Sequence, residues 1–303
     1  MKSKKKILII GGTGFIGYHL AKKAINNGWL VSSISSNRVK KIRNLKKVKY
    51  LICDITNKNK LKKIIKQNYD YVVNLGGYVN HTNKTKTLKS HFNGCKNLAE
   101  IFLNKKIKSF VQMGSSVEYG HAKSPQNEEM KCTTSQVNST YGKAKLLATK
   151  HLIELYKKYK FPATVLRLYL TYGEKQDVNR FLPIVINSCI KNQSFPCSHG
   201  NQFRDFVYID DLVDAIIKSL KNKRAQGQIF NIGSGKPKNI KKLIKIIKKK
   251  CKGGKPQFGM IKLRKDEIKS LYPKIIKVKK MINWKPRINF EKGLQKTIKS
   301  YYV

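Results

Sequence analysis

The sequence is poor in acidic residues, with 16 Asp and Glu against 65 Lys and Arg, and its formal net charge is +49. A basic excess of this size is typical of proteins that bind nucleic acids or anionic membranes. Only eight of the basic residues are arginine, however, and no basic repeat is interleaved with aromatic residues. We interpret most lysines as solvated surface charges produced by codon drift in an AT-rich genome, and we expect no specific nucleic-acid partner.

Cysteines and long hydrophobic runs are also scarce. The six cysteines form no C-x-x-C pair and no cluster with histidine, which argues against a disulfide framework or a metal site. The basic start of the chain leads into only four apolar residues, Ile7–Ile10, before two glycines. This run is too short for a signal peptide or a membrane span, and no later segment is long enough. We therefore expect a cytoplasmic protein with no bound metal and no membrane contact.

What the sequence does have is a regular alternation of short apolar strands and amphipathic helices. This alternation predicts an α/β fold with a Rossmann-type doubly wound parallel sheet. We predict strands at 7–10, 30–34, 47–52, 71–75, 109–113 and 163–168, and helices at 15–26, 58–67, 89–103 and 141–159.

The pattern loosens after residue 170. Strands at 206–208 and 228–231, with a helix at 210–221 between them, are predicted to return to the main sheet. This organisation predicts two domains. The dinucleotide-binding domain takes residues 1–170 plus 205–232, and a smaller C-terminal substrate-binding domain takes residues 171–204 plus 233–303.

Three glycines stand between the first strand and the first helix. In such a turn the first glycine permits the tight bend, the second lets the backbone approach a pyrophosphate, and the helix N-terminus offers N–H donors. The alternative is a turn with a purely structural role. We predict that a dinucleotide binds here, at Gly11, Thr13, Gly14, Phe15, Ile16 and Gly17.

The end of the second strand bears on which dinucleotide binds. An enzyme that uses NAD would carry an acidic residue there to bind the ribose 2′-hydroxyl. The segment from Ser33 to Arg38 has no carboxylate. Ser35 and Arg38 would instead suit a 2′-phosphate, which favours NADP over NAD, although Arg38 could equally be a solvated loop charge.

Two further strand ends are predicted to border the cofactor. Asp54, next to Ile55, follows the third strand and could accept a hydrogen bond from the adenine amino group. Its alternative role is the N-cap of the following helix. Leu75, Gly76 and Gly77 lie where the fourth strand ends and are predicted to be beside the dinucleotide.

Tyr141 and Lys145 are four residues apart at the start of a helix, so their side chains share one face. An isolated tyrosine has a pKa near 10, and a neighbouring ammonium group favours the phenolate that proton transfer requires. Ser115 and Ser116, after the fifth strand, are candidates to hold the substrate oxygen. This combination predicts proton transfer coupled to hydride transfer.

With these motifs the chain resembles the extended short-chain dehydrogenase/reductase family, in the branch of NAD(P)-dependent nucleotide-sugar epimerases, dehydratases and 4-keto reductases. The resemblance implies that the substrate is a sugar on a nucleoside diphosphate and that hydride transfer takes place at sugar C4. It also implies that Tyr141 is the acid/base and that Lys145 adjusts the pKa of Tyr141. It covers nearly the whole chain, through the glycine turn, residues 74–77, 115–120, 141–145, 167–173, 204–211 and 230–235, and the closing Trp284-Lys285-Pro286.

The sequence departs from the family pattern at two places. Dehydratases of the family carry an Asp-Glu pair after the active-site hydroxyl, whereas this chain has Ser116-Val117 there, with Glu118 one step displaced. This difference argues against dehydration. The second departure is Leu170, where many epimerases have asparagine. This difference puts in doubt the contact that the family's asparagine makes on the phosphate side of the substrate.

Arginine is rare in this chain, so each one is a candidate for bidentate recognition of phosphate. Arg204 and Arg264 fall where the family binds the diphosphate, and Arg180 lies in the loop that closes over the nucleotide. The alternative is an ordinary ion pair, such as Arg204 with Asp205 or Asp210.

These observations predict an epimerase or a 4-keto reductase. Two features favour reduction. No acidic residue follows the second strand, and the C-terminal part of the chain is similar to reductases such as abequose synthase. A 4,6-dehydratase and a non-catalytic NADP-binding sensor or scaffold are the alternatives. The family resemblance also implies a homodimer, formed through the helices around residues 89–103 and 141–159.

Overall fold

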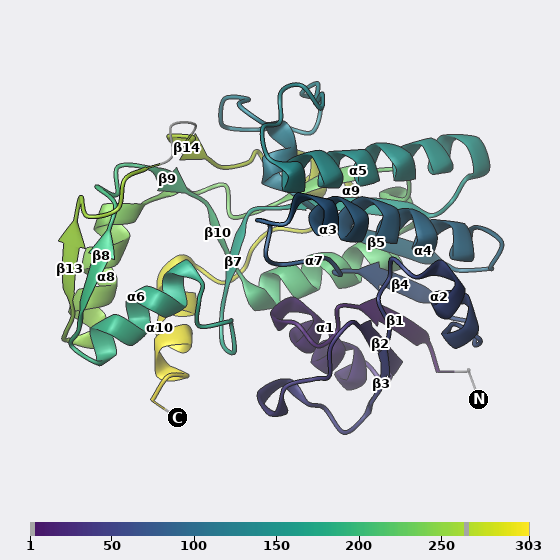
Figure 1. Ribbon diagram of the computed structural model, residues 1–303, viewed down its shortest axis with the longest axis horizontal. Coiled ribbons are helices and arrows are strands. Elements are labelled where there is room, and N and C mark those ends of the chain that lie inside the picture. The colour runs from purple at the N-terminus through teal and green to yellow at the C-terminus, as the bar shows by residue number, and fades with distance from the viewer. Residues whose placement is uncertain (1–3, 264–266, 303) are drawn as a thin grey trace.

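The computed structural model describes residues 4–263 and 267–302. Within these ranges, seven strands form one sheet in which every neighbouring pair is parallel (Figure 1). The predicted Rossmann-type doubly wound sheet is thereby confirmed. Side by side, the strands are β11 (Ile229–Ile232), β6 (Ala163–Leu168), β5 (Ser109–Ser115), β4 (Tyr71–Asn74), β1 (Lys6–Ile10), β2 (Leu30–Ser35) and β3 (Val48–Ile52).

Both faces of the sheet are buried, as the continuous apolar strands require. Ile7 and Ile9 of β1 pack on one face, towards α1 (Phe15–Asn26) and α7 (Ile209–Lys221), whereas Leu8 and Ile10 pack on the other. Figure 1 shows the helices of this second face stacked above the sheet. They are α2 (Lys58–Ile64), α3 (Lys84–Leu88), α4 (Gly94–Leu103) and α5 (Thr140–Tyr159).

The helix predicted at 89–103 begins earlier than expected, at Lys84, and is not uniform. A π-helical turn, η2 (Lys89–Asn93), joins α3 to α4. π-Helical turns are rare in proteins, and those that occur are often found at functional sites.

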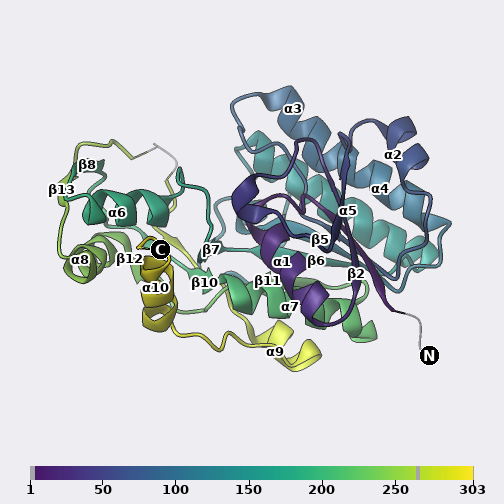
Figure 2. The same ribbon diagram turned by 90° about the horizontal axis from the view of Figure 1, so that it is seen from below.

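The smaller unit lies beyond the carboxyl ends of the strands (Figure 2). In it β8 and β13 pair in parallel, and β9 pairs with both β12 and β14. Its elements are α6 (Phe181–Ile190), β8 (Ser194–Cys197), β9 (Phe203–Arg204), β12 (Lys238–Asn239), α8 (Ile240–Cys251), β13 (Lys255–Phe258), β14 (Ser270–Leu271) and α10 (Phe290–Lys299).

One strand predicted for the main sheet lies elsewhere. The segment β10 (Phe206–Tyr208) pairs with β7 (Leu170–Tyr172) in a separate two-stranded sheet. The prediction that it returns to the main sheet was wrong, because its partner β7 lies outside that sheet, whereas β11 joins the main sheet beside β6 as predicted. The helix α9 (Ile276–Ile282) packs against β11, so part of the segment 233–303 lies on the larger unit.

Candidate active site

The glycine turn packs so closely that side chains are excluded from it. Gly11 has φ +78, and a Cβ there would lie 3.1 Å from the Leu75 carbonyl group. A Cβ on Gly17 would lie 2.3 Å from the Gly11 oxygen. The N–H of Gly14 closes the turn by donating to the Gly11 oxygen at 3.0 Å. The backbone of α1 can therefore approach the turn only because these positions are glycine.

The first turn of α1 offers backbone donors to a ligand. Its N-cap is Gly14, and among the described residues no side chain caps the N–H groups that follow. The side chain of Phe15 is buried in the core, and the side chain of Ile16 packs against that core. Both residues therefore present only their backbone N–H groups at the start of the helix. Uncapped donors at a helix N-terminus suit a phosphate group.

Ser35 and Arg38 differ in how closely they approach this turn. Ser35 ends β2, and its Oγ lies 3.5 Å from the N–H of Thr13. Arg38 is exposed in the loop that follows. The described structure thus brings Ser35 to the glycine turn and leaves Arg38 in solvent beyond it.

Asp54 is not a helix N-cap. Its Oδ1 accepts from the N–H of Thr56 at 2.8 Å, within a turn, and α2 is capped by Asn57, whose side chain accepts from the N–H of Lys60. The capping alternative was therefore wrong because Asn57 stands one residue before the helix. Asp54 itself is exposed.

The ends of β3 and β4 lie beside the glycine turn. Ile55 is buried, and the N–H of Leu75 donates to the Ile10 oxygen at 3.0 Å. A Cβ on Gly76 would lie 2.8 Å from the Ile10 side chain, and one on Gly77 would lie 1.9 Å from the His91 ring. The structure therefore gathers Leu75, Gly76 and Gly77 near the glycine turn.

Tyr141 and Lys145 lie together at the N-terminal end of α5. The Nζ of Lys145 is 5.7 Å from the centroid of the Tyr141 ring and donates to the Met113 carbonyl oxygen of β5 at 2.7 Å. Lys145 is only 4% exposed, and the ion pairs among the described residues do not include it. A buried ammonium group without an anionic partner can stabilise a phenolate that forms beside it.

Ser115 and Ser116 lie on the neighbouring element. Ser115 ends β5 and caps the short helix η3 (Ser116–Tyr119), its Oγ accepting from the N–H of Val117 at 3.5 Å. Both serines are largely buried. A Cβ on Gly142 would lie 3.1 Å from the Val117 oxygen, so η3 touches the start of α5 beside Tyr141.

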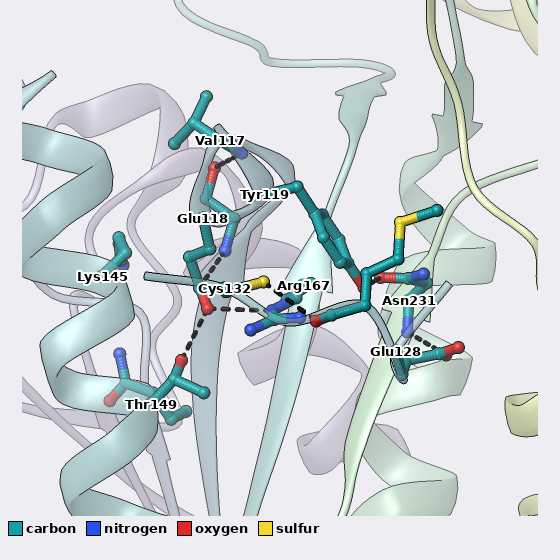
Figure 3. Close-up of polar contacts among 12 residues, drawn as sticks. Val117, Glu118, Tyr119, Glu128, Cys132, Lys145, Thr149, Arg167 and Asn231 are labelled. Atoms are coloured by element: carbon teal, nitrogen blue, oxygen red, sulfur yellow. Dashed lines mark hydrogen bonds and ion pairs between the residues drawn. The ribbon is translucent and has the colours of Figure 1, made fainter. Parts of the chain in front are cut away.

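Both carboxylate oxygens of Glu118 accept hydrogen bonds from the protein. One carboxylate oxygen accepts from the Ser115 N–H at 2.8 Å, and the other accepts from Thr149 Oγ1 at 2.8 Å and Arg167 Nε at 2.9 Å (Figure 3). The side chain is fully buried. Its oxygens are thus engaged within the fold, where they support the Ser115 turn.

The three arginines predicted to bind substrate have different settings. Arg180 is exposed at the start of α6, and burial of the His81 ring, followed by the charge of Arg180, lowers the pKa of His81. Arg204 pairs with Glu267 and not with Asp205 or Asp210. Arg264 lies outside the described residues.

Two histidines that the sequence analysis overlooked enclose Tyr141. The His81 ring stacks on the Tyr141 ring with centroids 4.1 Å apart, and the His91 ring meets it edge to face at 4.9 Å. The only available signal was their position, since both fall between the fourth strand and the helix near residue 103. The π-helical turn that orients His91 has no sequence pattern of its own.

A profile of the NAD dependent epimerase/dehydratase family matches residues 7–233, which is more than half of the chain. The chain belongs to this family. The family resemblance inferred from the motifs is thereby confirmed.

Relatives in the epimerase/dehydratase family match over their full length. A putative UDP-glucose 4-epimerase of Methanocaldococcus jannaschii is 29% identical, over 96% of this chain and 97% of the relative. CDP-abequose synthase of Salmonella muenchen is 27% identical, over 97% of both chains. The crystal structure of a UDP-glucose 4-epimerase from Thermotoga maritima with UDP-glucose has the same fold, with a TM-score of 0.91, 24% identity and 98% coverage of both chains.

In residues 4–263 and 267–302, no group of three or more His, Cys, Asp or Glu residues could hold a metal ion. No helix in these ranges is long and apolar enough to cross a membrane.

Proposed function

We propose that this family member is an NAD(P)-dependent nucleotide-sugar epimerase or 4-keto reductase that acts at sugar C4. The observation that carries the proposal is the pairing of the Tyr141 ring with the buried ammonium group of Lys145, 5.7 Å away, next to the serines that end β5. The full-length similarity to a putative UDP-glucose 4-epimerase and to CDP-abequose synthase supports both reactions.

Each side chain has a defined part in the proposed reaction. The dinucleotide, when bound, supplies or accepts the hydride at C4. Tyr141 holds the oxygen on C4 and moves its proton, accepting it during oxidation and donating it during reduction. Lys145 stabilises the phenolate form, since its ammonium group is buried beside the ring. Ser115 or Ser116 donates a hydrogen bond to the same oxygen and fixes its direction.

The cofactor is proposed to be NADP, with NAD as the alternative. The glycine turn and the uncapped start of α1 fit the pyrophosphate common to both. The support for NADP is the absence of a carboxylate between Ser33 and Arg38, together with the Ser35 hydroxyl beside Thr13. A ribose 2′-phosphate would find donors there, whereas a 2′-hydroxyl would lack its usual acceptor.

The substrate is proposed to be a sugar on a nucleoside diphosphate. Arg180 stands at the start of α6 in the smaller unit, and its charge, after burial of the ring, helps to lower the pKa of His81, which stacks on Tyr141. We propose Arg204 and Arg264 as diphosphate ligands and Arg180 as a substrate-binding residue in the loop that closes over the nucleotide. For Arg204 this role requires a guanidinium group that contacts phosphate while it remains paired with Glu267.

The dehydratase alternative lacks a free acid at the expected place. Glu118 is engaged by Ser115, Thr149 and Arg167, so it cannot remove a proton from a sugar without breaking a buried ion pair. A non-catalytic sensor or scaffold would not need a buried Lys145 beside Tyr141 that forms no ion pair with the described residues.

A panel of nucleotide sugars tests the proposal. Consumption of NADPH with a 4-keto-6-deoxy sugar nucleotide indicates a reductase, and interconversion of UDP-glucose and UDP-galactose without net cofactor change indicates an epimerase. Tyr141→Phe should abolish either activity while it leaves dinucleotide binding intact. Turnover by Tyr141→Phe at the wild-type rate would refute the assignment.

A further inference from the structure

Arg43 is a buried arginine that the proposed reaction does not use. It ends the short helix η1 (Lys41–Arg43), in the loop that leaves β2 and carries Arg38, and it is only 5% exposed. Burial of a guanidinium group is costly unless its N–H donors are paired. The partners of Arg43 therefore indicate what this buried charge does.

The Arg43 side chain binds a segment far along the chain, between β7 and α6. Its Nε donates to the carbonyl oxygen of Lys175, 132 residues away, at 3.1 Å, and its Nη2 is 3.0 Å from Oδ1 of Asp177. Lys175 returns the contact, since its Nζ donates to the carbonyl oxygen of Ile42 at 2.7 Å. These contacts join the loop after β2 to the segment that leads into α6.

This segment contains an unfavourable backbone conformation at Lys175. The residue has φ +61, in the left-handed region that a residue with a side chain rarely adopts. A conformation of this kind persists where the surrounding structure holds it. Arg43 holds Lys175 at its carbonyl group, and Ile42 holds it at Nζ. We therefore expect the backbone of the segment to move when Arg43 is replaced.

The two ends of the segment are held by different partners. At the β7 end, the carbonyl oxygen of Glu174 accepts from His19 Nε2 at 2.9 Å, and its carboxylate accepts from the Tyr208 hydroxyl at 2.6 Å. At the α6 end, Asp177 is bound by Arg43. Replacement of Arg43 should therefore free the α6 end and leave the β7 end in place.

Asp177 connects Arg43 to Arg180, which is proposed to bind substrate. Its carbonyl oxygen accepts from the N–H of Arg180 at 3.1 Å, which closes the turn before α6. Arg180 is the N-cap residue of α6, and it is exposed. The turn therefore sets the point from which the Arg180 side chain extends, and Arg43 acts on that point through Asp177.

We propose that Arg43 is a positioning residue for the substrate, because it holds the turn at 177–180 so that the Arg180 guanidinium group stands where the nucleotide sugar binds. The inference rests on the proposed function, which assigns Arg180 to the substrate. Arg43 itself lies in the loop that follows β2, beside the proposed dinucleotide site. A substitution of Arg43 should nevertheless weaken binding of the nucleotide sugar, while binding of the dinucleotide is retained.

Two substitutions break the contact, one from each side. Arg43→Lys keeps the charge but loses the fork that reaches a carbonyl group and a carboxylate together. Asp177→Ala removes the carboxylate, whose side chain is 40% exposed, so this variant should fold even if Arg43→Lys does not. Asp214→Ala is the matched control, because Asp214 forms a comparably exposed ion pair with Lys218 on α7.

Calorimetric titration with UDP-glucose, UDP, CDP and dTDP, and separately with NADPH, measures both affinities without turnover. Arg43→Lys and Asp177→Ala should each weaken binding of the nucleotide that the wild type binds most tightly by fivefold or more, and Asp214→Ala should not. The KM for the corresponding nucleotide sugar should rise by the same factor, with kcat and NADPH affinity within twofold of wild type.

Two results of these titrations overturn the inference. One is unchanged nucleotide affinity in the folded variants. The other is an equal loss of NADPH and nucleotide affinity, which would indicate that Arg43 has a purely structural role.

Arg180→Ala tests whether the effect passes through Arg180. In Arg180→Ala protein, Arg43→Lys should cause no further loss of nucleotide affinity, because the contact that it positions is already absent. Losses that add overturn the inference. A wild type that binds none of these nucleotides overturns the inference together with the proposed substrate. A wild type whose nucleotide affinity depends on Arg43, but which converts no nucleotide sugar, retains the inference and refutes the proposed reaction.

Discussion

Glu118 and Arg167 form an ion pair in which Oε2 and Nε are 2.9 Å apart and the side chains are 0% and 3% exposed. Burial opposes the charge of Arg167, yet Glu118 raises the pKa of this guanidinium group above its usual value. The second oxygen of Glu118 holds the Ser115 N–H. The pair therefore joins β6 to the turn that carries the proposed active-site serines (Figure 3).

Glu118→Gln should destabilise the protein strongly, because it leaves Arg167 buried without a counter-charge. Loss of one partner of a buried pair costs about 3–5 kcal/mol. Unfolding in urea measures the change in free energy. The matched control is Glu100→Gln, which breaks the partly exposed pair with Lys58 and should cost about 1 kcal/mol or less. Equal losses in the two variants would contradict a structural role for Glu118.

Gly17→Ala should distort the glycine turn and weaken dinucleotide binding by tenfold or more. Its Cβ would lie 2.3 Å from the Gly11 oxygen and 2.5 Å from the Gly12 Cα, and these backbone atoms would have to move. Calorimetric titration with NADPH and NADH measures the effect. Gly28→Ala is the control, since nothing lies within 4 Å of its Cβ and only its φ of +75 is unfavourable. It should cost stability without changing either affinity.

Arg38→Ala should weaken NADPH binding by about tenfold to a hundredfold, the usual contribution of a charged hydrogen bond, and leave NADH binding unchanged. The reason is that only NADPH carries the 2′-phosphate that Arg38 is proposed to contact. Arg224→Ala is the control, because Arg224 is an exposed arginine on the turn η4 (Lys223–Ala225). No effect of Arg38→Ala on either dinucleotide would show that Arg38 is a solvated loop charge, and an equal loss for both would contradict a contact with the 2′-phosphate.

Strand and helix periodicity was sufficient to predict the sheet, because its central strands are buried on both faces. The glycine turn and Tyr141 with Lys145 were also predictable, since their geometry depends on spacing within one or two elements. The position of β10 was not, because β10 pairs with β7, a short strand more than thirty residues earlier that the periodicity does not mark.

The histidines around Tyr141 were missed for a similar reason. His91 faces Tyr141 because a π-helical turn changes the direction of its side chain, and His81 reaches the same ring from a loop. Neither feature follows from helical periodicity. Asp54 was assigned a role that the structure does not give it. Its residue type fits an N-cap, but α2 starts later, after Asn57.

The neutral state of His91 should make the protein sensitive to acid. The pKa of His91 is about 3 in the folded state, lowered by burial and then by Lys145, against about 6.5 when unfolded. Between these values the unfolded chain binds the extra proton. The stability contributed by the neutral ring is therefore complete above pH 6.5 and falls as the pH drops towards 3.

His91→Phe keeps a ring against Tyr141 but removes this titration. The other histidines with lowered pKa, His19, His81 and His151, remain in both proteins, so the difference between the two isolates His91. Urea unfolding at pH 7.5, 6.5 and 5.5 should show that the wild type loses about 1 kcal/mol more than the variant between pH 6.5 and 5.5. Parallel losses in the two proteins would mean that the His91 ring is protonated in the folded state.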